Sequence, residues 1–291
     1  MSRIAETELI LNDDGSVYHL NLLPEDVAGT VITVGDPERV NEVSRHFDRI
    51  EIKKSKREFT THTGRIGNKR LTVISTGIGT DNIDIVLNEL DALINIDLQS
   101  RTLKKELTKL NIIRIGTSGA VQAGIPLDSL LVSEAAFGLD TLMHYYQQNH
   151  TEQELKMLSD IKAVLPSNCG LSPYIASGNT ELMGKLAEGI EKGITLTAPG
   201  FYAPQGRQVR APSAYTDLMN RIQAFQSGGK RITNLEMETA GIYGLSSVLG
   251  HRAISFNMIL ANRVTQQFSK SPQNAISHCV QVILQRLTEI I

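Results

Sequence analysis

Apolar and polar positions follow two periods along this chain. From residue 30 onward, short β-branched runs alternate with amphipathic segments of helical length. This pattern is typical of a largely parallel sheet flanked by helices, in which ligands bind at the carboxyl ends of the strands. Nothing repeats at a fixed period, and no Pro/Gly/Ser-rich linker divides the sequence. We therefore predict an α/β fold with one domain over residues 1–291.

The pattern predicts the individual elements as follows. Strands are expected at 30–34, 57–63, 70–75, 111–120, 128–136, 173–177, 194–197 and 253–260, with a hairpin turn around Gly67-Asn68. Helices are expected at 37–46, 83–93, 98–110, 152–163, 180–192, 215–225, 239–249 and 273–290. The segment 98–110 is predicted as a charged helix because its leucines recur at helical spacing.

The first predicted strand runs into Gly35-Asp36-Pro37-Glu38-Arg39. Asp36 suits an N-cap and Pro37 suits the first helical position. Backbone N–H groups, the helix dipole and Arg39 would then face the same point above the strand, an arrangement that binds anions. An ordinary capped helix with a surface arginine explains the same residues, so both interpretations stay open.

Arg114 lies inside the apolar run 111–120. Burying an unpaired guanidinium is costly, so Arg114 must meet a partner or face a polar pocket. An internal carboxylate would satisfy it as well as a bound anion would.

The long loop 198–212 carries Phe201, Gln205 and Arg207. The amide of Gln205 offers a donor and an acceptor side by side, Arg207 offers donors only, and Phe201 offers a face for stacking. Together they could recognise a planar heterocycle. A solvated loop with one aromatic anchor is the alternative.

Two carboxylates flank Met237 in Glu236-Met237-Glu238. This segment follows the apolar-alternating residues 231–233 and precedes the predicted helix 239–249, so it lies at a strand-to-helix junction. A carboxylate pair at such a junction can hold the paired hydroxyls of a sugar. Acids in the first turn of a helix also complement its dipole, which would explain Glu236 and Glu238 without a ligand.

Composition narrows the class of protein. A formal net charge of −2 gives no reason to expect nucleic acid or an anionic membrane as a partner. Cys169 and Cys279 are far apart and in no metal-ligand spacing. No apolar run approaches a membrane span, and residues 1–12 lack the apolar core of a secretory signal. We expect a cytoplasmic protein without a metal.

Several of these motifs, in this order, resemble the uridine phosphorylase branch of the nucleoside phosphorylases. The matching segments are 35–39, 57–61, 75–79, 114–120, Phe201-Tyr202 with Gln205 and Arg207, and 236–238. The resemblance implies a mixed α/β sheet with a barrel-like centre, flanked by helices, and assembly from dimers. It also implies phosphorolysis of uridine to uracil and ribose 1-phosphate, with inorganic phosphate as co-substrate and no metal or organic cofactor.

The resemblance further assigns roles to individual residues. The implied phosphate-binding residues are Gly35, Arg39, Arg57, Arg114 and Thr117. The implied ribose-binding residues are His19, Glu236, Met237 and Glu238, and the implied base-binding residues are Phe201, Gln205, Arg207 and Leu260. Catalysis would fall to Glu238, Arg114, Gln205 and Arg207. His19 and Arg57 would enter the site from the neighbouring subunit of a homodimer or higher homo-oligomer.

Three alternatives to this function stay open. A purine nucleoside phosphorylase or a nucleosidase would use the same fold, although the purine branch keeps an aspartate where this chain has Leu260-Ala261-Asn262-Arg263. A nucleoside-binding protein without catalysis is the third. Ala203-Pro204 and Gly206 depart from the family pattern, which leaves closure of this loop open. The predicted helix 98–110 is extra length, which leaves the assembly beyond the dimer open.

Overall fold

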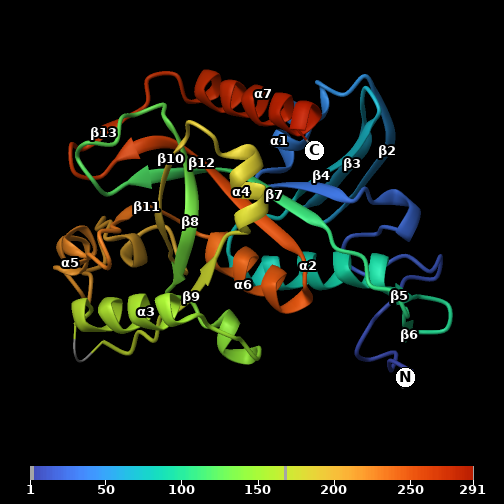
Figure 1. Cartoon of the computed structure of the whole chain (residues 1–291), viewed down its shortest axis with the longest axis horizontal. Helices are drawn as coiled ribbons and strands as arrows, with labels where there is room; N and C mark the ends of the chain where they lie inside the picture. The colour runs from blue at the N-terminus through green and yellow to red at the C-terminus, as the bar shows by residue number, and fades with distance from the viewer. Residues whose placement is uncertain (1–2, 167–168, 291) are drawn as a thin grey trace.

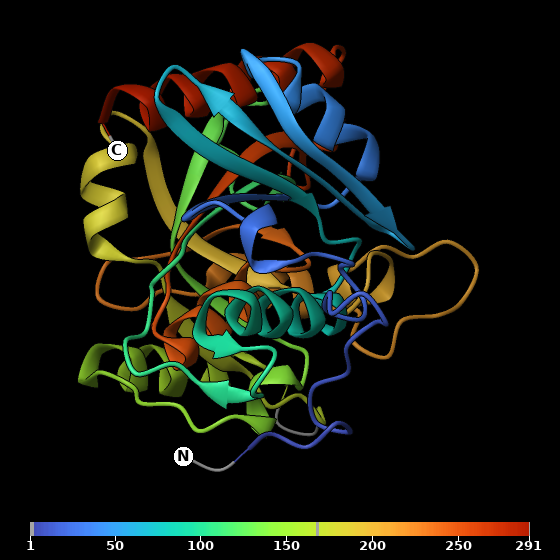
Figure 2. The same ribbon diagram turned by 90° about the vertical axis from the view of Figure 1, so that its right-hand side faces the viewer.

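A mixed sheet of eleven strands forms the centre of the computed structural model, which describes residues 3–166 and 169–290. The strand order is β13-β12-β8-β10-β11-β7-β1-β4-β3-β2, and β9 pairs with β8. Figures 1 and 2 show this sheet between two groups of helices. The predicted α/β fold is confirmed.

One part of the sheet closes on itself. Strand β7 (Asn111–Ala120) pairs with both β11 (Ile232–Glu236) and β12 (Arg252–Asn262). The circle is completed by β8 (Leu130–Gly138) and β10 (Glu191–Thr197). These five strands form a small barrel, as expected for the centre of the sheet.

The other strands extend the barrel on one side. Strand β1 (Thr30–Val34) pairs in parallel with β7 and with β4 (Lys69–Ser75), and β4 forms the predicted hairpin with β3 (Phe59–Ile66). Outside β3 lies β2 (Arg49–Lys56), which the sequence pattern missed. Because β2 is an exposed edge strand, it carries charged residues in place of an apolar run. Short strands complete the set: β5 (Ile96–Asp97), β6 (Thr102–Leu103), β9 (Tyr174–Ser177) and β13 (Gln267–Phe268).

The helices cover both faces through separate apolar clusters. Helices α1 (Pro37–Ser44), α4 (Thr180–Leu186) and α7 (Pro272–Ile290) share one cluster, and α7 lies along the top of Figure 1. Helices α2 (Thr80–Asn95) and α6 (Thr239–Leu249) share a second cluster on the other face. Helices α3 (Glu152–Val164) and α5 (Leu218–Ala224) share a third, beside β10 and β11. Three short 3-10 turns are η1 (Pro24–Asp26), η2 (Leu142–Tyr145) and η3 (Ala203–Gln205).

The predicted helix at 98–110 is wrong. Leu103 and Leu107 are 41% and 58% exposed, whereas Leu110 is fully buried, so the three leucines do not form one packed helical face. The segment instead forms the β5–β6 turn and then a stretch held by Asn95, whose amide accepts from the Thr108 N–H and donates to the Thr108 carbonyl.

Two predicted boundaries also shift. The helix expected at 180–192 ends at Leu186, because the chain enters β10 at Glu191 and pairs there with β8. Arg57 was expected within a strand, but it lies in the turn between β2 and β3 with a left-handed φ of 57°.

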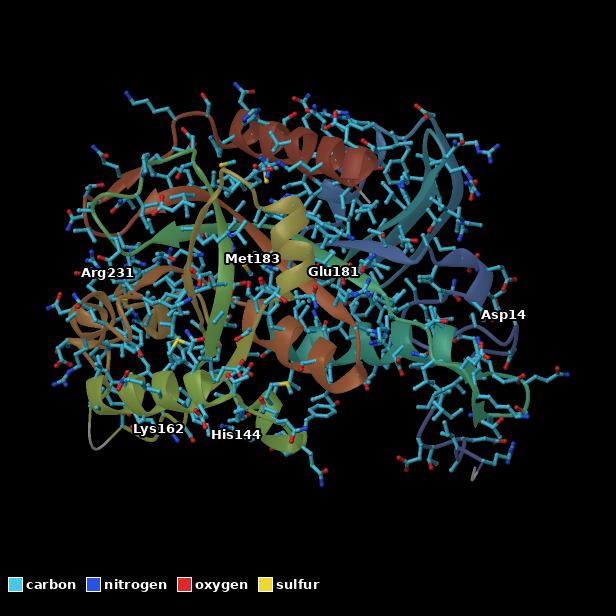
Figure 3. The ribbon with its side chains drawn as sticks, in the orientation of Figure 1. Asp14, His144, Lys162, Glu181, Met183 and Arg231 are labelled. Atoms are coloured by element: carbon cyan, nitrogen blue, oxygen red, sulfur yellow. The ribbon has the colours of Figure 1, made fainter. Side chains whose placement is uncertain are left out.

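Charged side chains occupy the periphery of the molecule. Asp14, Lys162 and Arg231 are exposed and lie at its edges in Figure 3. Among the described residues, the structure contains no helix with both the length and the apolar character needed to cross a membrane.

Candidate functional site

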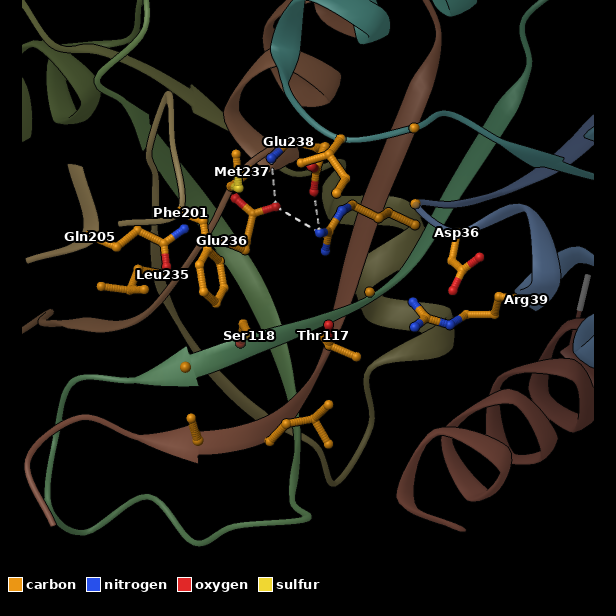
Figure 4. Close-up of a pocket in the computed structure, with 18 of the residues that line it drawn as sticks. Asp36, Arg39, Thr117, Ser118, Phe201, Gln205, Leu235, Glu236, Met237 and Glu238 are labelled. Atoms are coloured by element: carbon orange, nitrogen blue, oxygen red, sulfur yellow. Dashed lines mark hydrogen bonds and ion pairs between the residues drawn. The ribbon is translucent and has the colours of Figure 1, made fainter. Parts of the chain in front are cut away.

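A cavity of about 630 Å³ opens where β1, β4, β10 and β11 end. Figure 4 shows its two ends: Asp36 and Arg39 lie at one, and Phe201 and Gln205 lie at the other. We call these the anion end and the aromatic end. Eleven of the thirteen predicted site residues line this cavity: Gly35, Arg39, Arg114, Thr117, Phe201, Gln205, Arg207, Glu236, Met237, Glu238 and Leu260.

Arg114 lies between two carboxylates at the centre of the cavity. Its Nη2 is 2.9 Å from Glu236 Oε2 and 2.7 Å from Glu238 Oε2, and all three side chains are buried (Figure 4). Both interpretations of the buried arginine therefore hold, because Arg114 pairs with internal carboxylates and also faces a cavity.

The two carboxylates have different surroundings. Glu236 accepts hydrogen bonds from the N–H groups of Glu238 and Thr239 at 2.8 and 2.9 Å, and from the Thr197 hydroxyl at 2.6 Å. It therefore satisfies free amides at the start of α6, which confirms the helix interpretation for this residue. Glu238 accepts from the Gly79 N–H at 2.9 Å and from Arg114, so it joins the α2 loop to the cavity centre.

Burial and charge act in opposite directions on this cluster. Burial raises the pKa of Glu238, and the positive charge of Arg114 only partly offsets it. Burial opposes the charged form of Arg114, but the carboxylates of Glu236 and Glu238 outweigh it and raise the pKa of the guanidinium. Arg114 is therefore a permanent cation, and Glu238 is the carboxylate that binds a proton more readily than usual.

Gly116 makes room for the Arg114 side chain. A Cβ at Gly116 would overlap the guanidinium of Arg114, which lies across this position of β7. The glycine in the segment 114–120 is therefore required by a close side-chain approach.

The anion end combines a helix start with a second arginine. Asp36 caps α1 by accepting from the Glu38 N–H at 2.9 Å, as predicted. No carboxylate of the described residues lies within salt-bridge distance of Arg39. Burial lowers the pKa of Arg39, and the charge of Arg114 adds to this effect while Glu42 and Asp36 oppose it. Two neighbouring cations beside a helix N-terminus make a site for an anion.

The aromatic end is organised by Arg207. Its Nη1 donates to Gln205 Oε1 at 2.5 Å and to the Phe201 carbonyl at 2.7 Å, and its guanidinium carbon lies 3.7 Å from the centre of the Phe201 ring. Burial, followed by the nearby charge of Arg263, lowers the pKa of Arg207 to about 10. Gln205 is only 3% exposed. The loop interpretation with one aromatic anchor does not account for this buried amide.

Arg263 holds the same loop from the end of β12. It donates to the carbonyls of Gln205 and Gly206 at 3.0 and 3.4 Å. Gly206 has a φ of 67° and closes the η3 turn, so the loop residues that departed from the family pattern are firmly placed.

His19 and Arg57 do not line the cavity. His19 Nδ1 lies 2.6 Å from Glu89 Oε1, and the Arg57 side chain is exposed. The two residues share a neighbour, because Tyr18 packs edge-on against His19 at 4.9 Å and lies 5.7 Å from the Arg57 guanidinium. They therefore form one surface group outside the cavity of their own chain.

Sequence reasoning missed several residues that line the cavity. Ser118 and Gly119 directly follow the predicted Thr117, so their place in the same motif was the available signal. Ile78 and Phe268 are 68% and 62% exposed at the cavity. Phe268 comes from β13, a two-residue strand without a recognisable pattern. Within residues 3–166 and 169–290, no group of His, Cys, Asp and Glu side chains could hold a metal ion.

The chain is similar to known proteins over nearly all of its length. The model of the phosphorylase superfamily matches residues 30–291. A uridine phosphorylase of Thermococcus kodakarensis is 30% identical over 274 residues, with 93% of this chain and 86% of that protein covered. A uridine phosphorylase of Haemophilus influenzae is 28% identical, with 86% and 88% covered.

A solved structure shares the whole fold. It is a nucleoside phosphorylase of Trypanosoma brucei, described as showing uridine phosphorylase activity. The two chains superpose with a TM-score of 0.85 at 28% identity, over 96% of this chain and 99% of the other.

Proposed function

This chain belongs to the phosphorylase superfamily, and we propose that it cleaves uridine with inorganic phosphate to give uracil and ribose 1-phosphate. The observation that carries the proposal is Arg114, which bridges an anion site and a carboxylate within one cavity. Phosphorolysis needs the phosphate and the sugar side by side, because the phosphate attacks a sugar carbon next to the hydroxyls that the carboxylate binds.

Phosphate would occupy the anion end. Arg39 and Arg114 supply positive charge, and the loop at Gly35 supplies backbone amides at the start of α1. The Nε–H of Arg114 meets no acceptor among the described residues, which leaves it available to a phosphate oxygen. Multidentate binding of this kind suits a dianion and would serve no purpose for attacking water.

Ribose would lie over Glu238 and Met237. The Glu238 carboxylate can accept hydrogen bonds from the 2′ and 3′ hydroxyls, while Met237 packs on the sugar. As the glycosidic bond lengthens, positive charge develops on the ribose, and the neighbouring carboxylate and phosphate stabilise it.

The base would occupy the aromatic end. Phe201 and Leu260 provide apolar walls, and the amide of Gln205 matches adjacent C=O and N–H groups on a pyrimidine ring. Arg207 stabilises the negative charge that grows on the departing base, so this end acts on the leaving group.

The proposed assembly is a homodimer or a larger homo-oligomer. His19 and Arg57 lie together outside their own cavity, and we place them at the ribose and phosphate of the partner subunit. We further propose a cytoplasmic location, in keeping with the free thiols of Cys169 and Cys279.

A substrate panel tests the proposed function. Uridine, inosine and methylthioadenosine are each incubated with the protein, with and without phosphate. We expect release of the free base from uridine alone, and only with phosphate. Equal release without phosphate would indicate a nucleosidase, and preferred use of inosine would indicate a purine enzyme.

The position of the acids disfavours the purine alternative. The carboxylates that line the cavity are Asp36, Glu236 and Glu238, and all three have partners away from the aromatic end. A purine ring would therefore lack an acid at its departing nitrogens. A nucleoside-binding protein without catalysis would bind uridine in this panel and release no uracil.

A further inference from the structure

The interior of the five-stranded barrel is lined by a buried polar belt. Each barrel strand contributes at least one polar side chain, and these side chains are joined by hydrogen bonds into one chain that runs around the interior. The members are Arg114 and Ser118 of β7, Asn257 of β12, Ser133 of β8, Thr195 of β10 and Asn234 of β11.

The first half of the belt starts at the cavity arginine. Arg114 Nη1 donates to Asn257 Oδ1 at 3.0 Å, and Asn257 Nδ2 donates to Ser133 Oγ at 2.9 Å. The hydroxyls of Ser133 and Thr195 are 2.5 Å apart. Asn257, Ser133 and Thr195 are each fully buried and do not line the cavity.

The second half returns to β7. Thr195 Oγ1 donates to Asn234 Oδ1 at 2.9 Å, and Asn234 Nδ2 donates to Ser118 Oγ at 3.0 Å. Asn234 is fully buried, whereas Ser118 lines the cavity. The belt therefore begins and ends on two cavity residues of the same strand.

The donors of the belt all point in one direction. A guanidinium can only donate, so the amide oxygen of Asn257 must face Arg114 and its NH₂ must face Ser133. The single proton of Thr195 is used toward Asn234, so the proton between the two hydroxyls must come from Ser133. Ser118 then accepts from Asn234, and its own O–H finds no acceptor among the described residues.

We propose that Asn257, Ser133, Thr195 and Asn234 are positioning residues, which fix Arg114 for phosphate and keep the Ser118 hydroxyl as a donor toward the nucleoside. The proposal rests on the proposed function, because it concerns the two substrates of that reaction. Neither amide touches the cavity, so both act only through the residues at the ends of the belt.

The polar filling of this barrel indicates a positioning role in addition to a contribution to stability. Small barrels are commonly filled by apolar side chains, which need no partners. A polar filling is stable only when every group is satisfied, and it then holds its members in one arrangement. Every donor and acceptor between neighbouring members of the belt is paired, which fits a role in fixing the orientation of Arg114 and Ser118 at its two ends.

Cutting the belt at its centre gives the first test. Ser133→Ala removes one oxygen that contacts neither Arg114 nor Ser118. We expect the KM for phosphate to rise about three- to tenfold, because the Asn257 amide loses its 2.9 Å hydrogen bond and keeps only the 3.4 Å contact with Ser255 Oγ. Ser246→Ala is the matched control, since its hydroxyl is equally buried and finds no hydrogen-bond partner among the described residues. That variant should leave both KM values unchanged.

Cutting the belt at either end gives the second test. Asn257→Leu should raise the KM for phosphate about tenfold and change the KM for uridine little. Asn234→Leu should raise the KM for uridine and change the KM for phosphate little, because Ser118 loses the hydrogen bond from Asn234. The two sites match in residue type and burial, so a merely structural role would change both constants together or change only the melting temperature.

The outcomes separate the two proposals. The belt proposal would be overturned if Ser133→Ala and Ser246→Ala had the same KM for phosphate. It would also be overturned if Asn257→Leu and Asn234→Leu changed the KM values for phosphate and uridine in the same way. If the unaltered protein released no uracil with phosphate, the proposed function itself would fail. Melting temperatures of all variants show that each protein is folded during the measurement.

Discussion

At the scale of single residues, the site depends on one guanidinium shared between two purposes. Arg114 pairs with Glu236 and Glu238 and also faces the anion end of the cavity. Removing one partner of such a buried pair leaves the other charge unpaired, which costs about 3 to 5 kcal/mol. Tests of the site should therefore change charge or geometry and keep the volume.

The two glutamates provide such a test. Glu238→Gln should lower kcat/KM for uridine about 100-fold, because an amide NH₂ cannot accept the ribose hydroxyls. Glu236→Gln should mainly lower the melting temperature, because Glu236 satisfies the amides at the start of α6. Steady-state kinetics and thermal unfolding of both variants check this division. The opposite pattern would exchange the two roles.

The residues that line the cavity could be predicted from the sequence more completely than the residues that position them. Gly35 and Glu238 lie just after strands, Arg114 is a charge inside an apolar strand, and Gln205 lies in a long loop, so each belongs to a local motif that the sequence shows. The belt residue Asn257 has no local signal, because its role depends on the closure of β7 onto β12. The positions of His19 and Arg57 relative to substrate depend on a second chain.

Among the secondary-structure elements, two segments differ from the prediction because their tertiary surroundings outweigh their sequence pattern. Leucine spacing predicted a helix at 98–110, but Leu103 and Leu107 are exposed while Leu110 is buried in the core, so the leucines share no single packed face. Strand β2 was missed because both of its faces carry charged residues, which is typical of an edge strand. In both segments, tertiary position decided the structure.

Edge strand β2 carries a charge cluster whose effect on stability depends on pH. Hydrogen bonds from Arg70 and Arg65 lower the pKa of Glu51 to about 2. Because this value is below the ordinary 4.5, the stabilisation is complete above pH 4.5 and is lost as the pH falls through 2. Glu51→Gln should therefore lower the melting temperature at pH 7, and the difference should shrink on acidification.

The control for this prediction is an exposed glutamate without a charged partner. Arg286 donates to the Glu188 carbonyl, but no basic side chain of the described residues forms a salt bridge with the Glu188 carboxylate, so Glu188→Gln should change the melting temperature little at either pH. A difference for Glu51→Gln that persists unchanged to low pH would contradict the assignment to ion pairing.

For the molecule as a whole, we propose that two chains together form each site. His19 is oriented by Glu89 of α2, which accepts from the N–H groups of His19 and Leu20 and lies 2.6 Å from the imidazole. An imidazole held through Nδ1 presents Nε2 outward, which suits contact with a ligand in a neighbouring subunit.

Mixed dimers test this requirement. Arg57→Ala and Glu238→Gln should each inactivate a homodimer. In a mixed dimer, the subunit with an intact Glu238 receives Arg57 from its partner, so one site is complete. Co-expression in equal amounts should restore about a quarter of the activity of the unaltered protein, because half of the dimers are mixed. No recovery in dimers proven to be mixed would place Arg57 outside the partner's site.

In the proposed reaction, phosphate held by Arg39 and Arg114 attacks the sugar carbon itself. Following the reaction of uridine by ³¹P NMR tests this step, because the phosphorus signal reports where the phosphate goes. We predict that ribose 1-phosphate accumulates in amounts equal to uracil while inorganic phosphate is consumed. Release of uracil with free ribose and unchanged inorganic phosphate would contradict the account.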